Sequence, residues 1–487
     1  MHHSAQIFAN QLSGDVYISD IYYILGAVAC FLVVVAISLI DGGLVNPKHL
    51  IDTLVQTLLS ALIAGAALLL GGYALWMWQY NVALGVPHPL QQAFSDWWLF
   101  GRYMTTYPQF VDPASAPDIE GQQIFVMFFF GYAAIFGAFI HSMGLGRIKP
   151  SVSYILSAVA GGIMMPVLTY LTWGSASFLT NNGLHDYVGA YSLYMFVGIW
   201  STILAWRLGP RLTSTNGLNP HMFGSGILVL MLAIPLFVIG CGYVTPGSGY
   251  TGISGTTSGI GIVLCNIFAA FAGGGMSGGI IAYRTHKPVN ALLGPIAGYV
   301  ACTAIFDIAW PWECLLVSMI GPCIMYVSKD LMTWLNLDDQ KLMPLALGNS
   351  IFSVLMAGVI GAGRAQGGVA GATGAYAFQH AHISFMMQCM GLVVTLLICA
   401  GSGLILVFLL ERTIGLRVAR QIEQDGLDMW YWNEWRKSRK MRVSPKAMSN
   451  YDPARTAGQG TVSKLTRTYD GPVLVHDENA LPVRSGL

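Results

Sequence analysis

The chain has 487 residues, of which 54% are hydrophobic and only 10% are charged. Soluble domains carry roughly one quarter charged residues, so this composition excludes an ordinary water-soluble globular protein. The formal net charge of +1 does not point to a particular class of charged partner. We therefore expect an integral membrane protein.

Apolar stretches recur along the chain, and each is about as long as a helix must be to cross a hydrocarbon layer. They are continuous runs rich in Leu, Ala, Gly and Phe rather than short alternating segments, so they predict an all-α bundle and not a β-barrel. The eleven predicted spans are 21–41, 52–78, 121–143, 151–173, 187–207, 222–243, 257–283, 290–309, 313–329, 342–363 and 383–410.

The domain organisation follows from these spans. Residues 1–20 are polar and contain no basic stretch, which predicts an extracytoplasmic N-terminal segment rather than a cleaved signal peptide. Residues 21–412 form the predicted transmembrane domain. Residues 413–487 form a predicted cytoplasmic tail that is basic, aromatic, and partly extended or disordered.

Positive charges are distributed unevenly over the predicted loops. Lys and Arg are enriched in short cytoplasmic loops, so an N-terminus outside the cell and a C-terminus in the cytoplasm fit this sequence best. We expect this orientation in a cell (inner) membrane. The residues then on the cytoplasmic side are Lys48, Arg147, Lys149, Arg207, Arg211, Arg284, Lys287, Lys329 and Lys341, and those outside are Arg102 and Arg364.

An odd number of spans fits two groups of five in opposite orientation plus one closing helix, the arrangement of an inverted-repeat transporter. The eight cysteines show no Cys-x-x-Cys spacing and lie mostly in apolar stretches, as buried small residues do. His380 and His382 alone do not form a metal-ligand set. We find no nucleophile with a base and no phosphate-binding loop, and expect no enzyme, cofactor, metal or nucleic-acid partner.

Two features have alternative interpretations. The aromatic loop at 79–120 is either a lid over an outer vestibule or an anchor at the membrane interface. Asp307 is either a solvated residue at a membrane surface or, if it is buried within its span, a functional carboxylate.

Several motifs follow one another in an order that resembles the ammonium transporter (Amt/Mep/Rh) family, over about residues 20–430. The most specific match is Glu-Gln-Asp-Gly-Leu-Asp at 423–428, which is preceded by Gly-Leu-Arg-Val at 415–418. The remaining motifs are Asp-Gly-Gly-Leu-Val-Asn-Pro-Lys at 41–48, Gly-Gly-Tyr-Ala-Leu at 71–75, Gly137-Ala138, Leu-Thr-Trp-Gly at 171–174, Asp186, Lys287-Pro288 and Leu-Leu-Gly-Pro-Ile-Ala-Gly at 292–298.

The resemblance implies a homotrimer with one narrow pore through each protomer, and ammonium or ammonia as the substrate. It implies recruitment at Trp173 and Thr245, since aromatic faces attract a cation and a hydroxyl accepts a hydrogen bond. Asp186 is expected to support the backbone of this outer site. A phenylalanine gate is implied as well, although such a run equally suits core packing. The gate residues would be Phe125, Phe128 and Phe129.

The chain departs from the family at the pore centre, where the resemblance implies two facing histidines. Counting along the motifs places these positions at Tyr194 and at Ala346 or Leu347, and no histidine falls at the centre of a predicted span. The polar side chains expected to take over hydrogen bonding are Tyr191, Ser192, Tyr194, Asn349 and Ser350.

Two further departures lie near the predicted cytoplasmic surface. Asp41 stands where the family usually has tyrosine. His141 stands where it often has glutamate, and we expect a capping role for this histidine. The tail also departs, with an aromatic and polybasic block at 430–440 that suits either an anionic membrane surface or a docking arm for a cytoplasmic or membrane protein.

The sequence supports two functions. The first is an Amt-like channel or transporter for ammonium, ammonia or a similar small molecule. The second is a scaffold that does not transport and serves as a sensor or as a structural subunit of a larger membrane complex. The loss of both pore histidines favours the second, whereas family membership favours the first; fold alone decides neither.

Overall fold

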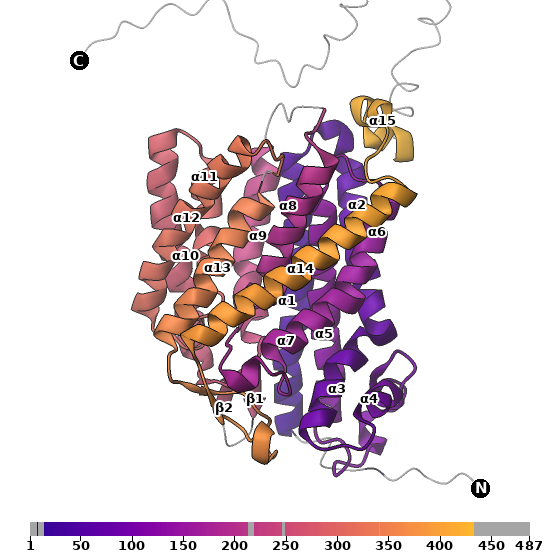
Figure 1. Cartoon of the computed structure of the whole chain (residues 1–487), viewed down its shortest axis with the longest axis vertical. Helices are drawn as coiled ribbons and strands as arrows, with labels where there is room; N and C mark the ends of the chain where they lie inside the picture. Colours follow the sequence, from indigo (N-terminus) through magenta and orange to yellow (C-terminus); the bar gives the residue numbers. More distant parts are fainter. Residues whose placement is uncertain (1–6, 8–13, 213–218, 246–248, 340, 433–487) are drawn as a thin grey trace, which may run out of the picture. The chain divides into compact units, whose positions relative to one another are not determined.

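The computed structural model is a bundle of long helices that run between two opposite ends of the molecule (Figure 1). It describes residue 7 and residues 14–212, 219–245, 249–339 and 341–432. All structural statements below concern these residues. The predicted tail beyond residue 432 lies outside them.

Within the described ranges, nine helical segments are long and apolar enough to cross a membrane. They are α1 (Gly14–Leu44), α2–η3–α3 (Leu50–Ala67, Leu68–Gly72, Tyr73–Ala83), α5 (Ile119–Met143), α6–η6–α7 (Pro150–Val159, Ala160–Met164, Met165–Trp173), α9 (Pro220–Ile239), α10 (Ile260–Thr285), α12 (Pro311–Trp334), α13 (Leu342–Ile360) and α14 (Phe385–Thr413). Two shorter segments lie between them: η8–α8 (Ala190–Met195, Phe196–Leu208) and α11 (Val289–Ala301).

Single π-helical turns interrupt two of the long helices, and both turns contain a glycine pair. η3 includes Gly71 and Gly72, and η6 includes Gly161 and Gly162. The two turns pack on each other so closely that a Cβ atom on Gly72 would lie 3.0 Å from the Gly162 carbonyl oxygen. Small residues of this kind let helix backbones approach one another in a membrane.

The helices are grouped by their packing. α1 packs against α5 and α9, and α2 packs against α5 and α6. α10 packs against α11 and α12, while α13 contacts α8, α11, α12 and α14. The aromatic core described below lies within the first of these groups.

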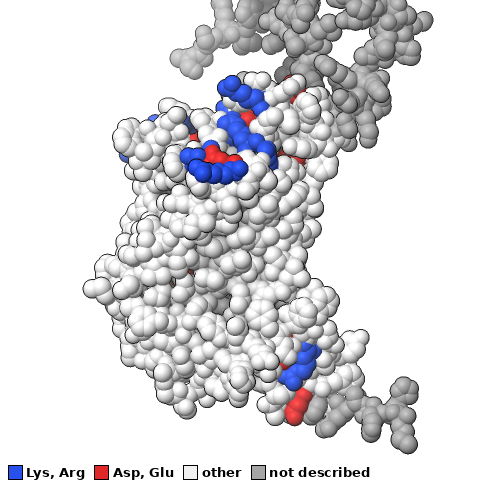
Figure 2. Space-filling model, turned by 45° about the vertical axis from the view of Figure 1, so that its right-hand side comes forward, with Lys and Arg blue, Asp and Glu red and all other residues white. Residues whose placement is uncertain are grey.

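The two ends of the bundle differ in chemistry. One end carries most of the described Lys and Arg side chains, and Figure 2 shows them gathered there with a few carboxylates. We call this end the basic face; it includes the α1–α2 turn, the α5–α6 turn and the segment after α14. That segment contains α15 (Arg420–Asp425) and η10 (Asp428–Trp432).

We call the opposite end the strand face, because short β-strands lie there. β1 (Gly242–Thr245), β2 (Gly249–Gly252) and β3 (Thr257–Ser258) form one antiparallel sheet in this order. β4 (Ala365–Gln366) and β5 (Ala381–His382) form a second antiparallel pair. The loop predicted at 79–120 also lies at this end and contains α4 (Pro89–Trp97).

One predicted span is shorter in the structure than the sequence indicates. The stretch 290–309 is mostly apolar, but α11 ends at Ala301 and turns follow. The Ala304 N–H donates to the Ser353 hydroxyl at 2.9 Å rather than to a carbonyl four residues earlier. Hydropathy does not show such a helix end, because apolar residues such as Ile305 and Phe306 continue through the turns.

Candidate functional site

A layer of three stacked aromatic rings lies in the core of the bundle. Phe128 and Tyr132 lie one turn apart on α5, and Phe237 lies near the end of α9. The ring centroids of Phe128 and Phe237 are 6.1 Å apart, and those of Tyr132 and Phe237 are 5.9 Å apart. All three side chains are buried. Two helices therefore present their ring faces to each other.

Trp173 extends this aromatic layer. It is the last residue of α7, and its ring lies 5.3 Å from the ring of Tyr132. The side chain is only 1% exposed, and its indole N–H has no hydrogen-bond partner among the described residues. A buried donor without a partner costs free energy. The position is thus suited to a small molecule that meets aromatic faces and accepts a hydrogen bond.

Asp186 fixes the backbone at the start of η8. Its carboxylate accepts hydrogen bonds from the backbone N–H groups of Ala190 at 2.8 Å and Tyr191 at 3.2 Å. Burial raises the pKa of Asp186 to about 6, and these hydrogen bonds act in the opposite direction. The carboxylate contacts backbone rather than the aromatic layer, which is the geometry of a structural support.

Phe237 also borders an apolar cavity of about 60 Å³ that extends toward the basic face. Within the cavity wall, the hydroxyl of Tyr194 on η8 donates to the hydroxyl of Tyr299 on α11 at 3.2 Å. A cavity of this size admits molecules as small as water. The remaining described wall residues are Val33, Ile37, Ile40, Ile135, Phe139, Leu193, Ile227, Leu230, Ile234, Leu293, Ile296, Lys341, Leu342 and Leu345.

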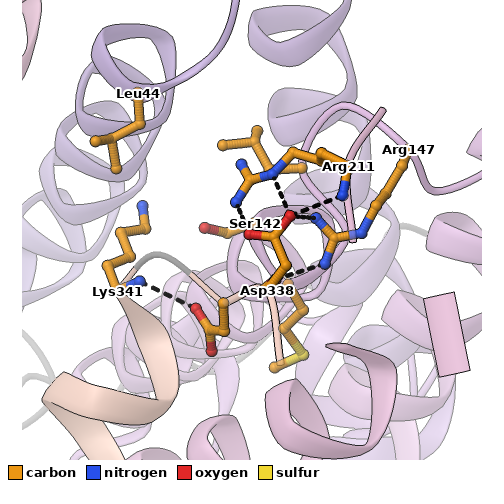
Figure 3. Close-up of a pocket in the computed structure, with 9 residues that line it drawn as sticks. Leu44, Ser142, Arg147, Arg211, Asp338 and Lys341 are labelled. Carbon is orange, nitrogen blue, oxygen red and sulfur yellow. Dashed lines mark hydrogen bonds and ion pairs between the residues drawn. The ribbon is translucent and has the colours of Figure 1, made fainter. Parts of the chain in front are cut away.

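Lys341 lies at the end of this cavity nearest the basic face. Its ammonium group forms an ion pair with the Asp41 carboxylate, which also accepts a hydrogen bond from the Ser142 hydroxyl at 3.0 Å. Lys341 also borders a small polar pocket on the basic face, where Arg211 and Arg147 surround Asp338 (Figure 3). Lys341 therefore borders both the apolar cavity and the charged surface pocket.

The predicted gate residues have different neighbours. Phe128 alone stacks on Phe237. Phe125 stacks on Phe128 and lies 5.6 Å from the ring of Tyr243, on the side of the strand face. Phe129 instead packs 5.0 Å from the ring of Trp76 on α3.

The predicted recruitment pair is described only in part. Trp173 lies against the aromatic layer, as above. Thr245 is the last residue of β1, where its backbone pairs with Gly249. The Thr245 side chain lies outside the described part of the structure, so its pairing with Trp173 stays a prediction.

The two positions where the family resemblance implies histidines differ in whether they border the cavity. Tyr194 borders the cavity. Ala346 and Leu347 do not, and the neighbouring Leu345 takes this place on α13. The Leu347 backbone is instead packed against Gly198, where an added Cβ would lie 2.9 Å from the Leu347 Cα atom.

The predicted polar residues also separate into two groups. The Ser192 hydroxyl lies 3.2 Å from the Tyr132 hydroxyl, next to the aromatic layer. Tyr191 donates to the Gln388 backbone carbonyl at 2.8 Å, away from the cavity. Asn349 and Ser350 form hydrogen bonds to backbone carbonyls of their own helix, α13.

Sequence reasoning missed four central residues: Tyr132, Phe237, Tyr299 and Lys341. Tyr132 and Tyr299 are hydroxyl-bearing residues near the middle of mostly apolar spans, a signal that marks buried polar contacts in membranes. Phe237 has no such signal, because phenylalanine also suits lipid contact. Lys341 was counted only as a loop charge.

His141 does not cap a helix. Its ring is 3% exposed, and neither ring nitrogen has a hydrogen-bond partner among the described residues. It lies near the end of α5, close enough to Lys341 for the two groups to interact electrostatically. The capping prediction is therefore wrong, because the side chain points into the bundle.

A second buried polar cluster lies at the strand face. The Nε2 atom of His185 lies 3.1 Å from Asp307 Oδ1, and Nδ1 lies 2.9 Å from Gln366 Oε1. Both members of the His185–Asp307 pair are fully buried. Burial lowers the pKa of His185, but the charge of Asp307 and the hydrogen bonds outweigh it, and the pKa is raised overall. Asp307 is thus a buried carboxylate and not a solvated one.

No group of three or more His, Cys, Asp or Glu side chains in the described part of the chain is arranged to hold a metal ion. His185 and Asp307 satisfy each other, and the described cysteines are unpaired thiols.

The comparisons with known proteins agree with this architecture. The model of the Ammonium Transporter Family matches residues 21–436. Ammonium transporter Amt1 of Methanocaldococcus jannaschii is 27% identical over 286 residues, which cover 58% of this chain and 69% of that protein. Ammonium transporter Amt2 of the same organism is 26% identical over 84% of this chain and 89% of its own length.

Solved structures show the same fold. A protein titled "Sensor Amt Protein" has a TM-score of 0.68 at 18% identity, with 86% of this chain and 98% of that chain covered. Candida albicans Mep2 has a TM-score of 0.64 at 16% identity, and the match covers 83% of this chain and 86% of that chain. At these identities the likeness concerns the fold alone.

The relatives are named as transporters, in agreement with the prediction that this chain is not an enzyme. The family model covers nearly the whole helical part of the chain. The helices and the family together make this a multi-pass membrane protein, and the chain belongs to the Ammonium Transporter Family.

Proposed function

We propose that this protein transports ammonium or ammonia across a membrane along a path from Trp173, past Phe237, into the apolar cavity. The observation that carries the proposal is the continuous series of ring contacts from Trp173 through Tyr132 to Phe237, which borders the cavity directly. Aromatic faces attract ammonium, and an apolar cavity beneath them favours the uncharged molecule.

The Tyr194–Tyr299 pair takes the place of the two family histidines in this proposal. Its two hydroxyls lie 3.2 Å apart in the cavity wall and are the neutral polar groups that a small N–H molecule meets there. Hydroxyls both donate and accept hydrogen bonds, so they offset part of the cost of leaving water.

The finer architecture is also part of the proposal. The nine long helices and the two shorter segments give eleven crossings, arranged as two groups of five plus α14. The basic face is the cytoplasmic side of a cell membrane, because Lys and Arg gather there. The protomers assemble as a homotrimer, as the family resemblance implies. Cross-linking in native membranes tests the trimer.

Flux measurement in sealed proteoliposomes tests the proposed function. An ammonium gradient should alkalinise the lumen faster in vesicles with protein than in empty vesicles, as reported by an enclosed pH dye. Trp173→Leu should lower this rate by about tenfold, because it removes the ring that faces Tyr132 and one desolvated cation–π contact is worth roughly 1–2 kcal/mol.

The matched control is Trp312→Leu, since Trp312 is 62% exposed on α12 and distant from the aromatic layer. This control should keep the wild-type rate. A wild-type rate equal to that of empty vesicles would contradict transport and leave the scaffold alternative.

A further inference from the structure

Two buried thiols lie against each other near the strand face. Cys302 directly follows α11, and Cys314 lies in the first turn of α12. The Cys302 thiol donates to the Cys314 backbone carbonyl, with 3.6 Å between sulfur and oxygen, and the two thiol groups also interact with each other. Both side chains are 0% exposed. Neither lines the apolar cavity, so the proposed transport path does not use this pair.

The packing of α11 on α12 explains why these thiols meet. A Cβ atom on Gly321 of α12 would lie 2.4 Å from the Ala297 carbonyl oxygen of α11, so the two backbones are in contact there. From this contact α11 continues forward to Cys302, while α12 leads backward to Cys314, because the contacts between the two helices run in opposite order. A disulfide needs Cα atoms about 4–7 Å apart, and close backbone approach of this kind is what such a spacing demands.

The chain between the two cysteines is not helical, yet it fixes its neighbours. The Thr303 carbonyl accepts the Val188 N–H at 3.2 Å, just before η8 begins. Asp307 holds the buried His185 ring at 3.1 Å. A covalent link between the two cysteines would close residues 303–313 into one loop and hold both contacts in place, because it restricts the backbone that carries them.

Two exposed tryptophans place this loop at a membrane surface. Trp310 is 52% exposed and Trp312 is 62% exposed, and tryptophans are enriched where a membrane meets water. Cys314 lies two residues after Trp312, about 3 Å along the helix axis. In the proposed orientation the strand face lies outside the cytoplasm. Thiol pairs that emerge there meet disulfide oxidants, whereas thiols on the cytoplasmic side stay reduced.

We infer that Cys302 and Cys314 are oxidised to a disulfide that joins α11 to α12 at the strand face. This inference rests on the proposed orientation and not on transport. One cysteine thiolate attacks a disulfide oxidant outside the cytoplasm and forms a mixed disulfide, which releases one thiol of the oxidant. The second cysteine then displaces the other thiol, so the oxidant receives two electrons and the two cysteine protons. Because both sulfurs are buried in the folded protein, this exchange precedes the packing of α11 on α12.

Burial then protects the finished bond from thiols in solution, because exchange requires direct access to a sulfur atom. The disulfide is therefore a structural one that persists in the folded protein.

Mass spectrometry of the full chain from native membranes tests the bond directly. The protein is unfolded in N-ethylmaleimide, which blocks every free thiol and prevents exchange, and is digested without reductant. The expected product is a pair of peptides joined through Cys302 and Cys314, which a reductant separates. The exposed Cys323 on α12 is the internal control and should carry maleimide. Maleimide on both Cys302 and Cys314 overturns the inference.

Melting temperatures of single and double variants give a second readout. Cys302→Ala and Cys314→Ala each remove the whole bond, so each should lower the melting temperature by about 3 °C through the freer unfolded chain. The double variant should melt close to either single variant, because the bond is lost only once. Cys323→Ala should melt as wild type does. Losses that add fully in the double variant overturn the bond.

A labelling experiment separates this inference from the proposed orientation. Ser115 is exposed in the loop at the strand face, so Ser115→Cys should react with a membrane-impermeant maleimide on intact cells. Such labelling together with free thiols at Cys302 and Cys314 overturns the disulfide alone. Labelling only in broken cells, again with both thiols free, overturns the orientation and the disulfide together. The flux assay depends on neither cysteine and reports on transport in each case.

Discussion

At the scale of single residues, several polar side chains inside the bundle occur as pairs. Tyr194 meets Tyr299, Lys341 meets Asp41, and His185 meets Asp307. A buried polar group without a partner costs roughly 1–3 kcal/mol, so pairing is what allows these residues to lie in an apolar protein. Exceptions among the described residues include both ring nitrogens of His141 and the Trp173 N–H, and the latter lies where the proposed substrate passes.

The His185 pair predicts a pH dependence of stability. The folded protein holds the pKa of His185 above its ordinary value, so the contribution to stability is fully present below about pH 6.5 and is lost as the pH rises through the folded pKa. We expect His185→Gln to lower the melting temperature of the detergent-solubilised protein most at acidic pH.

The difference in melting temperature between His185→Gln and the wild-type protein should shrink at alkaline pH, where the wild-type histidine has lost its charge. His382→Gln is the control, since His382 is exposed on β5 at the same end of the molecule. A His185→Gln difference that grows with pH would contradict the assigned direction of the pKa shift.

At the scale of secondary-structure elements, glycine sets the distance between α10 and α11. A Cβ atom on Gly274 would lie 2.4 Å from the Gly294 carbonyl oxygen and 2.8 Å from the Gly298 Cα atom. These neighbours are backbone atoms of a packed helix, so they cannot make room for a Cβ atom unless the helix itself moves. Close approach of this kind replaces the hydrophobic effect as the source of helix association in lipid.

Gly274→Ala should therefore destabilise the protein by about 1–3 kcal/mol, the usual effect of overpacking a helix contact. Unfolding in mixed micelles measures this change. Gly279 lies on the same helix, and a Cβ atom added to it would have no neighbouring atom within 4 Å, so Gly279→Ala should stay within about 0.5 kcal/mol of wild type. Equal effects of the two substitutions would refute the packing argument.

At the scale of the whole molecule, the segment after α14 ties distant turns of the basic face together. The buried Glu423 carboxylate accepts the Leu212 N–H at 2.8 Å and the Arg417 guanidinium at 2.9 Å. Asp428 accepts the Asp52 N–H at 2.8 Å at the start of α2. The segment thus joins the start of α2 to the turn after α8.

Glu423→Gln should cost about 1–3 kcal/mol, because it removes a charge-assisted hydrogen bond from a buried site. The melting temperature in detergent reports this loss. Glu411→Gln serves as the control, since its ion pair with Arg207 is about one third exposed and surface pairs contribute at most about 1 kcal/mol. A larger loss of melting temperature in Glu411→Gln than in Glu423→Gln would contradict the prediction that the segment after α14 stabilises the basic face.

Much of the architecture was predicted from the sequence. The helical membrane class follows from span length and charge content alone, since lipid requires apolar helices of a minimum length. The family followed from the order of short motifs, above all the one at 423–428. The absence of histidines from the span centres was likewise visible, because it depends only on residue type and position.

Only the tertiary structure decided which residues meet. Tyr194 and Tyr299 are 105 positions apart, and Asp41 and Lys341 are 300 apart. In a membrane protein, the lipid-facing and core-facing sides of a helix are both apolar, so the sequence pattern does not show which side faces a neighbour. Phe237, Tyr299 and Lys341 became part of a site only when separate helices brought them to one cavity.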